Sequence, residues 1–291
     1  MKTVKKADLI LNDDGSVFHL HLKPGQVSKN IILVGDPGRV SQVSSFFNSI
    51  DLQVQNREFV THTGVFKNKN VSVVSTGIGT DNIDIVLNEL DAVFNIDLDK
   101  REPKDILTSL NFIRIGTSGA LQSNIDVGSF LLSEKAIGFD GLLNFYASTE
   151  KYREKKFEES ILKNILKDTK FATPYVVKAS QNLIKAFGSP IVKKGVTASA
   201  PGFYAPQGRS LRLWPFHEDF NQKITEFDFK GQKITNFEME SSAIYGLSHL
   251  LGHSAVTLCA IIANRITQDY LSDYKTLMDS LIEYTLTNLP E

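Results

Sequence analysis

Short apolar runs alternate with longer amphipathic segments along the chain, and this alternation predicts the fold class. Apolar runs rich in β-branched residues predict strands at residues 31–34, 71–74, 111–115, 129–132, 195–197 and 256–262. Several of them show no inside–outside alternation, which is typical of strands covered on both faces. Apolar residues at helical spacing predict helices at residues 40–47, 82–94, 237–251 and 273–289. The order of these elements indicates an α/β protein with a parallel or mixed central sheet flanked by helices.

The domain organisation follows from what interrupts this pattern. We find no linker rich in Pro, Gly or Ser and no internal repeat, so residues 1–291 are interpreted as a single domain. Two charged stretches stand out. We predict that residues 97–109 form a surface insertion and that residues 150–170 form a solvated helix joined to a loop.

Composition and charge narrow the classes of function. Lys plus Arg is 32 and Asp plus Glu is 33, which gives a net charge of −1 and argues against a nucleic-acid binder. Any anion site must therefore consist of a few placed arginines. Cys259 is the single cysteine, lies in an apolar run and is predicted to be a buried thiol. Without a signal-peptide pattern or an apolar run near ~20 residues, we expect a cytoplasmic protein that does not bind membranes.

Candidate chemistry begins where the first predicted strand ends, at Gly35-Asp-Pro-Gly-Arg39. Asp36 is suited to cap the next helix, and Pro37 is suited to its first turn. A helix N-terminus offers free N–H groups to an anion, and Arg39 adds a planar cation that matches a phosphate. The alternative is an ordinary capped turn with a surface arginine.

Arg114 is a charge inside an otherwise apolar strand, in the sequence Arg114-Ile-Gly-Thr-Ser-Gly119. A buried cation needs either a carboxylate partner or a bound anion, and both alternatives stay open. Gly116 and Gly119 are predicted to open a turn in which Thr117 offers a hydroxyl. A third segment, Ser75-Thr-Gly-Ile-Gly79, precedes Asp81 as a predicted helix cap, and it lacks the third glycine of a dinucleotide-binding motif.

Two later segments carry groups suited to a base and a sugar. Phe203, Gln207 and Arg209 lie within seven residues; an aromatic ring can stack on a flat base, while an amide and a guanidinium can pair with its polar edge. Glu238-Met-Glu240 is predicted to open a helix. Acids at this position complement the helix dipole, and a carboxylate there can also accept hydrogen bonds from adjacent sugar hydroxyls.

Taken together, five motifs resemble the nucleoside phosphorylase superfamily of the uridine and hexameric purine type. In chain order they are Gly35-Asp-Pro-Gly-Arg39, Arg57-Glu-Phe59, Ser75-Thr-Gly-Ile-Gly79, Arg114-Ile-Gly-Thr-Ser-Gly119 and Glu238-Met-Glu-Ser241. The resemblance extends from Val17 to the C-terminal helix. Val17-Phe-His-Leu20, Gln207 with Arg209, and Asn264-Arg265 are similar to the uridine phosphorylase branch. The purine enzymes carry a Ser-Asp pair near the last of these positions.

The resemblance implies a single α/β domain with a mixed, partly barrel-like sheet, and the phosphorolysis of uridine by direct attack of phosphate at C1′. It implies no covalent enzyme intermediate and no cofactor. By position, phosphate would be bound by Gly35, Arg39, Arg57, Arg114 and Thr117; ribose by His19, Met239 and Glu240; and the base by Phe203, Gln207, Arg209 and Arg265. Arg114, Gln207 and Arg209 would be the catalytic groups. His19 and Arg57 would come from a neighbouring subunit of a homo-oligomer, a dimer or a trimer of dimers with shared sites.

The sequence also departs from the superfamily pattern. Residues 97–109 are longer than the usual connection, and Ala205-Pro206 replaces a residue plus glycine before Gln207. Asn82 stands where many relatives have serine beside an intersubunit monovalent-cation site, so a cation at the subunit interface stays an open alternative.

Other functions remain as alternatives: a purine nucleoside phosphorylase, a hydrolytic nucleosidase on the same fold, and a non-catalytic sensor of nucleosides or phosphate. The nucleosidase would normally lack the phosphate-binding arginines. A zinc hydrolase could use His249 and His253, which are spaced i, i+4. However, Gly252 is predicted to end the helix between them, and no third ligand is indicated.

Overall fold

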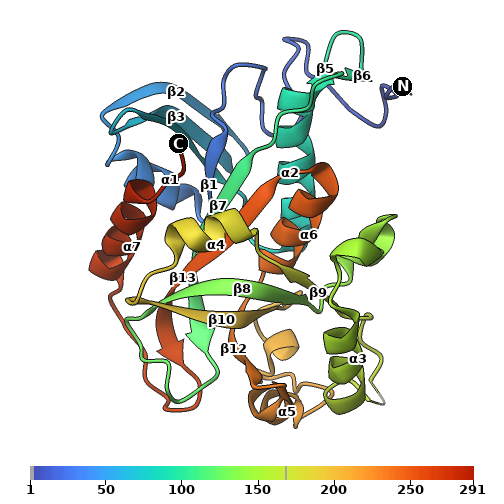
Figure 1. Ribbon diagram of the computed structural model, residues 1–291, viewed down its shortest axis with the longest axis vertical. Helices are drawn as coiled ribbons and strands as arrows, with labels where there is room; N and C mark the ends of the chain where they lie inside the picture. The colour runs from blue at the N-terminus through green and yellow to red at the C-terminus, as the bar shows by residue number, and fades with distance from the viewer. Residues whose placement is uncertain (1–2, 168) are drawn as a thin grey trace.

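A large mixed sheet forms the centre of the computed structural model, which describes residues 3–167 and 169–291 (Figure 1). Its strands are β1 (Asn30–Val34), β2 (Ser49–Asn56), β3 (Phe59–Phe66), β4 (Lys69–Ser75), β7 (Asn111–Ala120), β8 (Phe130–Gly138), β9 (Tyr175–Lys178), β10 (Val192–Ser199), β11 (Asp228–Phe229), β12 (Gln232–Glu238) and β13 (Ser254–Asn264). The helices are α1 (Pro37–Ser44), α2 (Thr80–Asn95), α3 (Lys155–Asn164), α4 (Gln181–Phe187), α5 (Phe220–Glu226), α6 (Ser241–Leu251) and α7 (Lys275–Thr287). Strands β5 (Ile96–Asp97) and β6 (Glu102–Pro103) form a separate hairpin.

The order of the strands makes one part of the sheet a closed ring. The sheet runs β11-β12-β10-β8-β13-β7-β1-β4-β3-β2, with β9 beside β8. Strand β12 also pairs with β7, where Asn236 lies opposite Ala120, so β7, β13, β8, β10 and β12 close on themselves. The sheet is therefore mixed and partly barrel-like, as the resemblance implied. The closure brings the C-terminal ends of β12 and β7 together, near which Thr117, Met239 and Glu240 lie.

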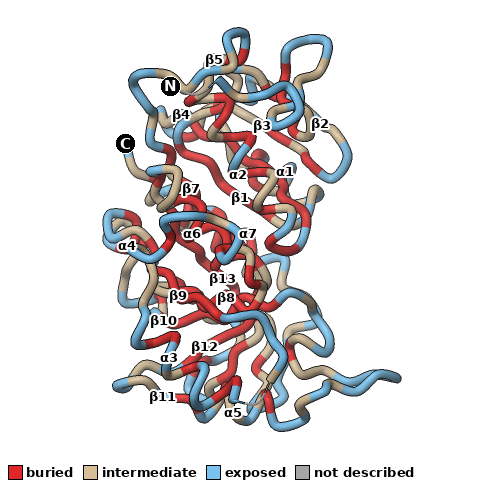
Figure 2. Tube along the Cα trace, turned by 90° about the vertical axis from the view of Figure 1, so that its right-hand side faces the viewer, coloured by how far each residue is buried: buried red, intermediate tan, exposed pale blue. Residues whose placement is uncertain are grey.

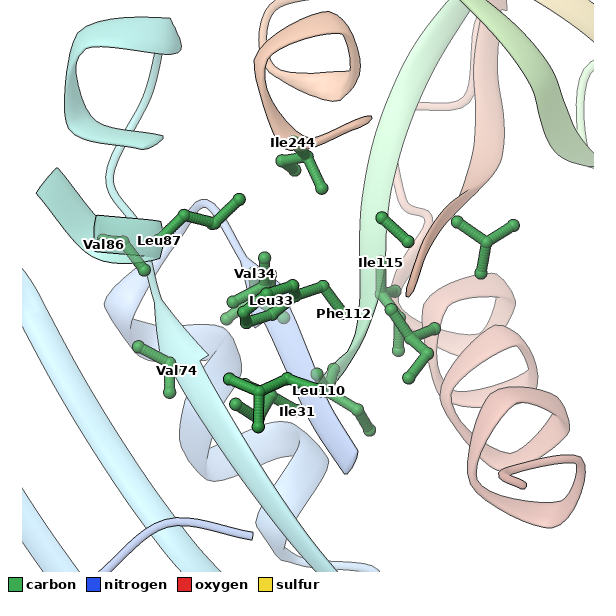
Figure 3. Packing of buried hydrophobic residues seen from close by; sticks show 14 of the residues in the cluster. Ile31, Leu33, Val34, Val74, Val86, Leu87, Leu110, Phe112, Ile115 and Ile244 are labelled. Atoms are coloured by element: carbon green, nitrogen blue, oxygen red, sulfur yellow. The ribbon is translucent and has the colours of Figure 1, made fainter. Parts of the chain in front are cut away.

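The open part of the sheet is held by an apolar core that helices cover. All five residues of β1 are buried, and β4 and β7 beside it are also largely buried. Figure 3 shows Val86 and Leu87 of α2 and Ile244 of α6 packed near Leu33, Val34 and Phe112 of the neighbouring strands. The buried trace runs through the centre of the molecule, whereas exposed segments lie at its edges (Figure 2). The strand ends that carry the site thus have a rigid base.

All of the predicted strands and helices form, but two predicted features near the site are wrong. Each predicted strand overlaps an observed strand, and each of the four predicted helices overlaps an observed helix. The predicted start of the helix at residue 237 is wrong, because Phe237 and Glu238 end β12 and α6 begins at Ser241. The predicted glycine turn at residues 116–119 is also wrong, since β7 continues to Ala120 in register with β13.

The two charged stretches differ in how they contact the body of the protein. In the first, the β5–β6 hairpin accepts a hydrogen bond from the backbone of Val4 through the carbonyl of Arg101, while Ile106 and Leu107 are exposed. In the second, α3 buries Phe157 and Ile161 and exposes its other face; Asp168 lies outside the described residues. Among the residues that the structure describes, no helix is long and apolar enough to cross a membrane.

Candidate active site

A cavity of about 720 Å³ lies where β1, β4, β7 and β12 end and where the chain leaves β10. Nine of the predicted site residues line it: Gly35, Arg39, Arg114, Thr117, Phe203, Gln207, Arg209, Met239 and Glu240. These residues come from segments far apart in the sequence. The structure therefore brings the predicted phosphate, ribose and base positions of one chain into a single space.

The cationic end of the cavity begins at the N-terminus of α1. The Asp36 carboxylate accepts the N–H of Gly38 at 2.9 Å, and Pro37 occupies the first turn, so the predicted cap is confirmed. Arg39 follows on the first turn and lines the cavity with Arg114. Burial, and after it the charge of Arg114, lowers the pKa of Arg39. Two guanidinium groups that disfavour each other's charge make this end of the cavity suited to an anion.

Arg114 projects from β7 into a buried ion-pair network. Its Nη2 donates to Oε2 of Glu240, and its Nε lies 3.8 Å from the Glu238 carboxylate. Its Nη1 is buried and has no hydrogen-bond partner among the described residues. Of the two partners that the sequence allowed for the buried Arg114, a carboxylate or an anion, the structure shows carboxylates. The Nη1 group of Arg114 keeps hydrogen-bonding capacity that the described residues do not use.

Gly116 has a different role from the predicted one. A Cβ at this position would collide with the Arg114 guanidinium, which folds back over the strand. Gly116 therefore leaves space for the cation and opens no turn. The prediction that Asp81 caps the next helix is also wrong: the N-cap of α2 is Gly79, and it has no side-chain cap.

Charges of both signs fix the ionisation of this network. Burial opposes the charge of Arg114, but the Glu240 and Glu238 carboxylates raise its pKa above the usual value. Burial raises the pKa of Glu240, while Arg114 acts in the opposite direction. The backbone N–H of Gly79 also donates to Glu240, at 2.9 Å. Glu240 is thus a buried acceptor held between a backbone N–H and a guanidinium.

Glu238 is the residue of this site whose role the sequence did not indicate. Its Oε2 accepts the backbone N–H groups of Glu240 and Ser241, each at 2.9 Å, and its Oε1 accepts the Ser199 hydroxyl at 2.5 Å. It also lines the cavity. Glu238 therefore anchors the turn that presents Glu240, in the way that a capping side chain anchors a helix start. The only signal in the sequence was a second acid two residues before Glu240.

The other end of the cavity is built from the loop after β10, which carries three of the residues predicted to bind the base. Residues Ala205–Gln207 form a single 3₁₀ turn, so the departure Ala205-Pro206 is accommodated as a tight turn. Gln207 is buried, and its amide oxygen accepts from Arg209 Nη1 at 2.5 Å. Arg209 also lies 3.9 Å from the ring centre of Phe203. Because arginine can only donate, the amide oxygen of Gln207 must face Arg209.

Arg265 lies behind this loop and does not line the cavity. Its Nη1 donates to the backbone carbonyl of Gln207 at 2.6 Å. Burial and the charge of Arg209 lower the pKa of Arg265 to about 10. Its observed contact is thus with the backbone that carries Gln207.

His19 and Arg57 lie together outside the cavity of their own chain. Arg57 is exposed and lies 5.7 Å from the ring centre of Phe18, and His19 packs edge-on against the same ring. His19 Nδ1 is 2.6 Å from the Glu89 carboxylate. Neither side chain therefore completes the site of its own chain.

The two histidines considered as zinc ligands make structural contacts away from the cavity. His249 pairs with the Lys178 carbonyl at 2.8 Å, whereas His253 lies 3.1 Å from Asp91, so the two imidazoles have separate structural partners. Gly252 ends α6 between them, as predicted. The described residues contain no group of three or more His, Cys, Asp or Glu that could hold a metal ion. Cys259 is fully buried, as predicted, and burial raises its pKa to about 12.

Asn82, which stands where many relatives have serine, lines the same cavity as Arg39 and Arg114.

Comparison with known proteins identifies the relatives of this chain. The family model of the phosphorylase superfamily matches residues 29–282. A uridine phosphorylase of Thermococcus kodakarensis is 30% identical over 89% of this chain and 81% of its own length. The uridine phosphorylase of Escherichia coli is 28% identical over 87% and 88%. A crystal structure of a Trypanosoma brucei nucleoside phosphorylase, described as showing uridine phosphorylase activity, superposes with a TM-score of 0.87 at 27% identity and covers 97% of this chain and 99% of its own.

Proposed function

We propose that this chain, which belongs to the phosphorylase superfamily, uses inorganic phosphate to cleave uridine into uracil and ribose 1-phosphate. One observation carries the proposal: a single cavity holds two arginines, a buried carboxylate and an amide–guanidinium pair. Several of its relatives are named uridine phosphorylases, and a relative named as a purine nucleoside phosphorylase is 22% identical.

Phosphate would bind between Arg39 and Arg114, close to Gly35 and Thr117. The unpaired Nη1 of Arg114 supports this position, because a buried N–H without a partner favours an incoming acceptor. A bound phosphate is already a nucleophile, so the protein has only to hold it beneath C1′. A phosphate oxygen then forms a bond to C1′ while the bond from C1′ to N1 breaks, and the electron pair leaves with the base.

Ribose would bind beside Met239, with its 2′- and 3′-hydroxyls directed to Glu240. Breaking the bond to the base creates positive charge on the sugar, as in other glycosyl transfers. The carboxylates of Glu240 and Glu238 are buried in the wall of the cavity, where their charge is weakly screened. They would therefore stabilise the sugar as its charge develops.

Uracil would bind beside Phe203, between Gln207 and Arg209. Its two carbonyls need donors, and its N3–H needs an acceptor. The amide N–H₂ of Gln207 and the remaining N–H groups of Arg209 supply donors, while the amide oxygen of Gln207 keeps a second lone pair for N3–H. The same donors would stabilise the negative charge of the departing base. Gln207, Arg209 and Arg114 are thus the proposed catalytic groups, and Arg265 would hold the loop in position.

The site would be completed by a second copy of the chain. His19 and Arg57 lie outside their own cavity, and Arg57 is exposed, which supports a homo-oligomer in which they reach a neighbouring site. There His19 would contact the 5′-hydroxyl of the nucleoside, and Arg57 would add a third cation to the phosphate position. The smallest assembly that shares sites in this way is a dimer.

The test of the proposed reaction is whether cleavage depends on phosphate. Uridine turnover is followed by ultraviolet absorbance with phosphate and in phosphate-free buffer, and the sugar product is identified by mass spectrometry. We expect turnover only with phosphate, and ribose 1-phosphate as the product. Release of free ribose at the same rate in both buffers would instead assign a hydrolytic nucleosidase. Ligand binding without any turnover would assign a sensor.

A further inference from the structure

Arg114 links the phosphate and ribose positions, because one guanidinium faces both. On one side it lines the cavity with Arg39, and its buried Nη1 has no partner in the part of the chain that the structure describes. On the other side its Nη2 donates to Glu240. In the substrate-free protein, Arg114, which is proposed to bind phosphate, is therefore paired with Glu240, which is proposed to bind ribose.

In the substrate-free protein, the Glu240 carboxylate already accepts hydrogen bonds on both of its oxygens. Its Oε1 accepts the Gly79 N–H at 2.9 Å, and its Oε2 accepts from Arg114, while only 3% of the residue is exposed. Water therefore has almost no access to this carboxylate. A buried carboxylate that loses its cation must find other donors, since an uncompensated buried charge is strongly destabilising. The two hydroxyls of a ribose are donors of the required kind.

Phosphate affects the same pair from the opposite side. The positive charges of Arg39 and Arg114 oppose each other, so an anion between them is favoured. As a phosphate takes up donors of Arg114, the attraction between Arg114 and Glu240 weakens. The carboxylate then gains more from sugar hydroxyls than it does in the substrate-free protein.

We infer that Arg114 and Glu240 couple the two substrates: phosphate draws Arg114 away from Glu240, the freed carboxylate binds the ribose hydroxyls, and each substrate tightens the binding of the other. This inference rests on the proposed function. Coupling between sites is reciprocal in binding free energy, and typical couplings change affinity about 5–150-fold. The ion pair of the free protein thus favours joint over separate binding of the two substrates.

The substitution Glu240→Gln keeps the size of the side chain and removes the negative charge that competes with phosphate for Arg114. Phosphate should bind this variant more tightly than the wild-type protein, by at least about fivefold, in the absence of nucleoside. A merely structural role, in which Glu240 holds Arg114 in place for phosphate, predicts weaker binding. The matched control is Glu58→Gln, which removes a carboxylate from the same cavity but none that pairs with Arg114. It should change the phosphate Kd by less than Glu240→Gln does.

The experiment is a calorimetric titration of inorganic phosphate into the wild-type protein and both variants. It is repeated for the wild type at saturation with a carbon-linked analogue of uridine, which phosphate cannot cleave. We expect the analogue to lower the phosphate Kd of the wild type at least about fivefold. An unchanged or weaker phosphate affinity in Glu240→Gln, or an equal gain in Glu58→Gln, would overturn the inference. If uridine is not cleaved at all, the proposed function fails, whereas the three phosphate titrations still decide whether Glu240 competes with phosphate for Arg114. If uridine is cleaved and the affinities are unchanged, only the coupling fails.

Discussion

The two ends of the cavity are built in different ways. The end proposed to bind phosphate and ribose consists of strand ends and a helix start, and its charged residues Arg114 and Glu240 are 6% and 3% exposed. The end proposed to bind the base is a loop between β10 and α5, in which Phe203 is 52% exposed and Trp214 is 72% exposed. Within residues 201–219 of that loop only Gln207 is buried; Arg209 donates to its amide oxygen and Arg265 donates to its backbone carbonyl.

The difference suggests that one end of the cavity carries the groups for the reaction and the other end carries the groups that select the base. In the proposed reaction the phosphate and the ribose stay the same when the base changes, and the residues proposed to bind them lie on a rigid core that cannot shift without exposing buried charge. The base varies among nucleosides, and its groups sit on a loop, where the backbone can change at low cost. We therefore expect changes at the first end to affect stability and all substrates together, and changes at the second end to affect only the base.

The largest effect is expected for Arg114→Ala. Removing one partner of a buried ion pair leaves Glu240 and Glu238 without their cation, which should lower the free energy of unfolding by about 3–5 kcal/mol. Losing a charged donor at the reacting centre should also reduce kcat/KM by about 10²–10³-fold. Urea unfolding and steady-state kinetics at limiting phosphate measure the two effects. Unchanged kinetics would remove Arg114 from the phosphate site.

Gln207→Ala should break the base end alone. The loss of one donor to the departing base should lower kcat for uridine about 10²-fold. The phosphate Kd and the midpoint of urea unfolding should stay close to the wild-type values, because the Gln207 side chain hydrogen-bonds Arg209 of its own loop and neither of the arginines proposed to bind phosphate. Titration of phosphate into the variant provides the control. A large loss of phosphate affinity would show that the two ends are not separate.

Mixing variants tests whether a third region, from a neighbouring subunit, completes the site. His19→Ala and Gln207→Ala proteins are each purified with little activity, then combined under conditions that exchange subunits. If His19 acts in the neighbouring site, random pairing restores about a quarter of the sites in a dimer. Activity that stays at the sum of the two separate proteins would contradict shared sites. A fully active monomer in sedimentation at assay concentration would also contradict them.

The smallest effect is expected on the exposed surface of the base loop. Trp214→Ala should change the free energy of unfolding by no more than about 0.5 kcal/mol, because the side chain is largely exposed. The contrasting variant is Phe112→Ala in the fully buried part of β7, where removal of an aromatic ring costs about 3–5 kcal/mol. Urea unfolding of both proteins checks the comparison. A Trp214 variant as unstable as the Phe112 variant would mean that the loop is part of the core.

The same difference explains what the sequence could predict. Strands such as residues 31–34 were found because they are apolar throughout, and buried strands in covered sheets have this pattern. The sequence does not indicate β2, because its residues are mixed and all eight of them are partly or fully exposed. The helix start was placed too early because acids at residues 238 and 240 fit a helix dipole. In the fold, Glu238 instead ends a strand that closes the ring against β7.

Sequence motifs predicted the site residues, but they did not predict the buried ion-pair network that joins them. Local spacing indicated Arg39, Arg114 and Gln207, since each stands out against its neighbours. The contacts among Arg114, Glu238 and Glu240 join positions more than 100 residues apart, and no local pattern encodes them. Gly116 was taken for a turn residue because glycine usually marks turns. Its observed role, leaving room for the guanidinium, depends on the side-chain conformation of Arg114.

The most direct test of the account is the ratio of kcat/KM for uridine to that for inosine at saturating phosphate. A site that pairs specific polar atoms rejects ligands that leave those atoms unpaired, so we expect a ratio of at least ~10². Gln207→Ala should lower this ratio, whereas variants at the phosphate end should leave it nearly unchanged. Inosine turning over as fast as uridine would contradict the assignment of the base loop to uracil.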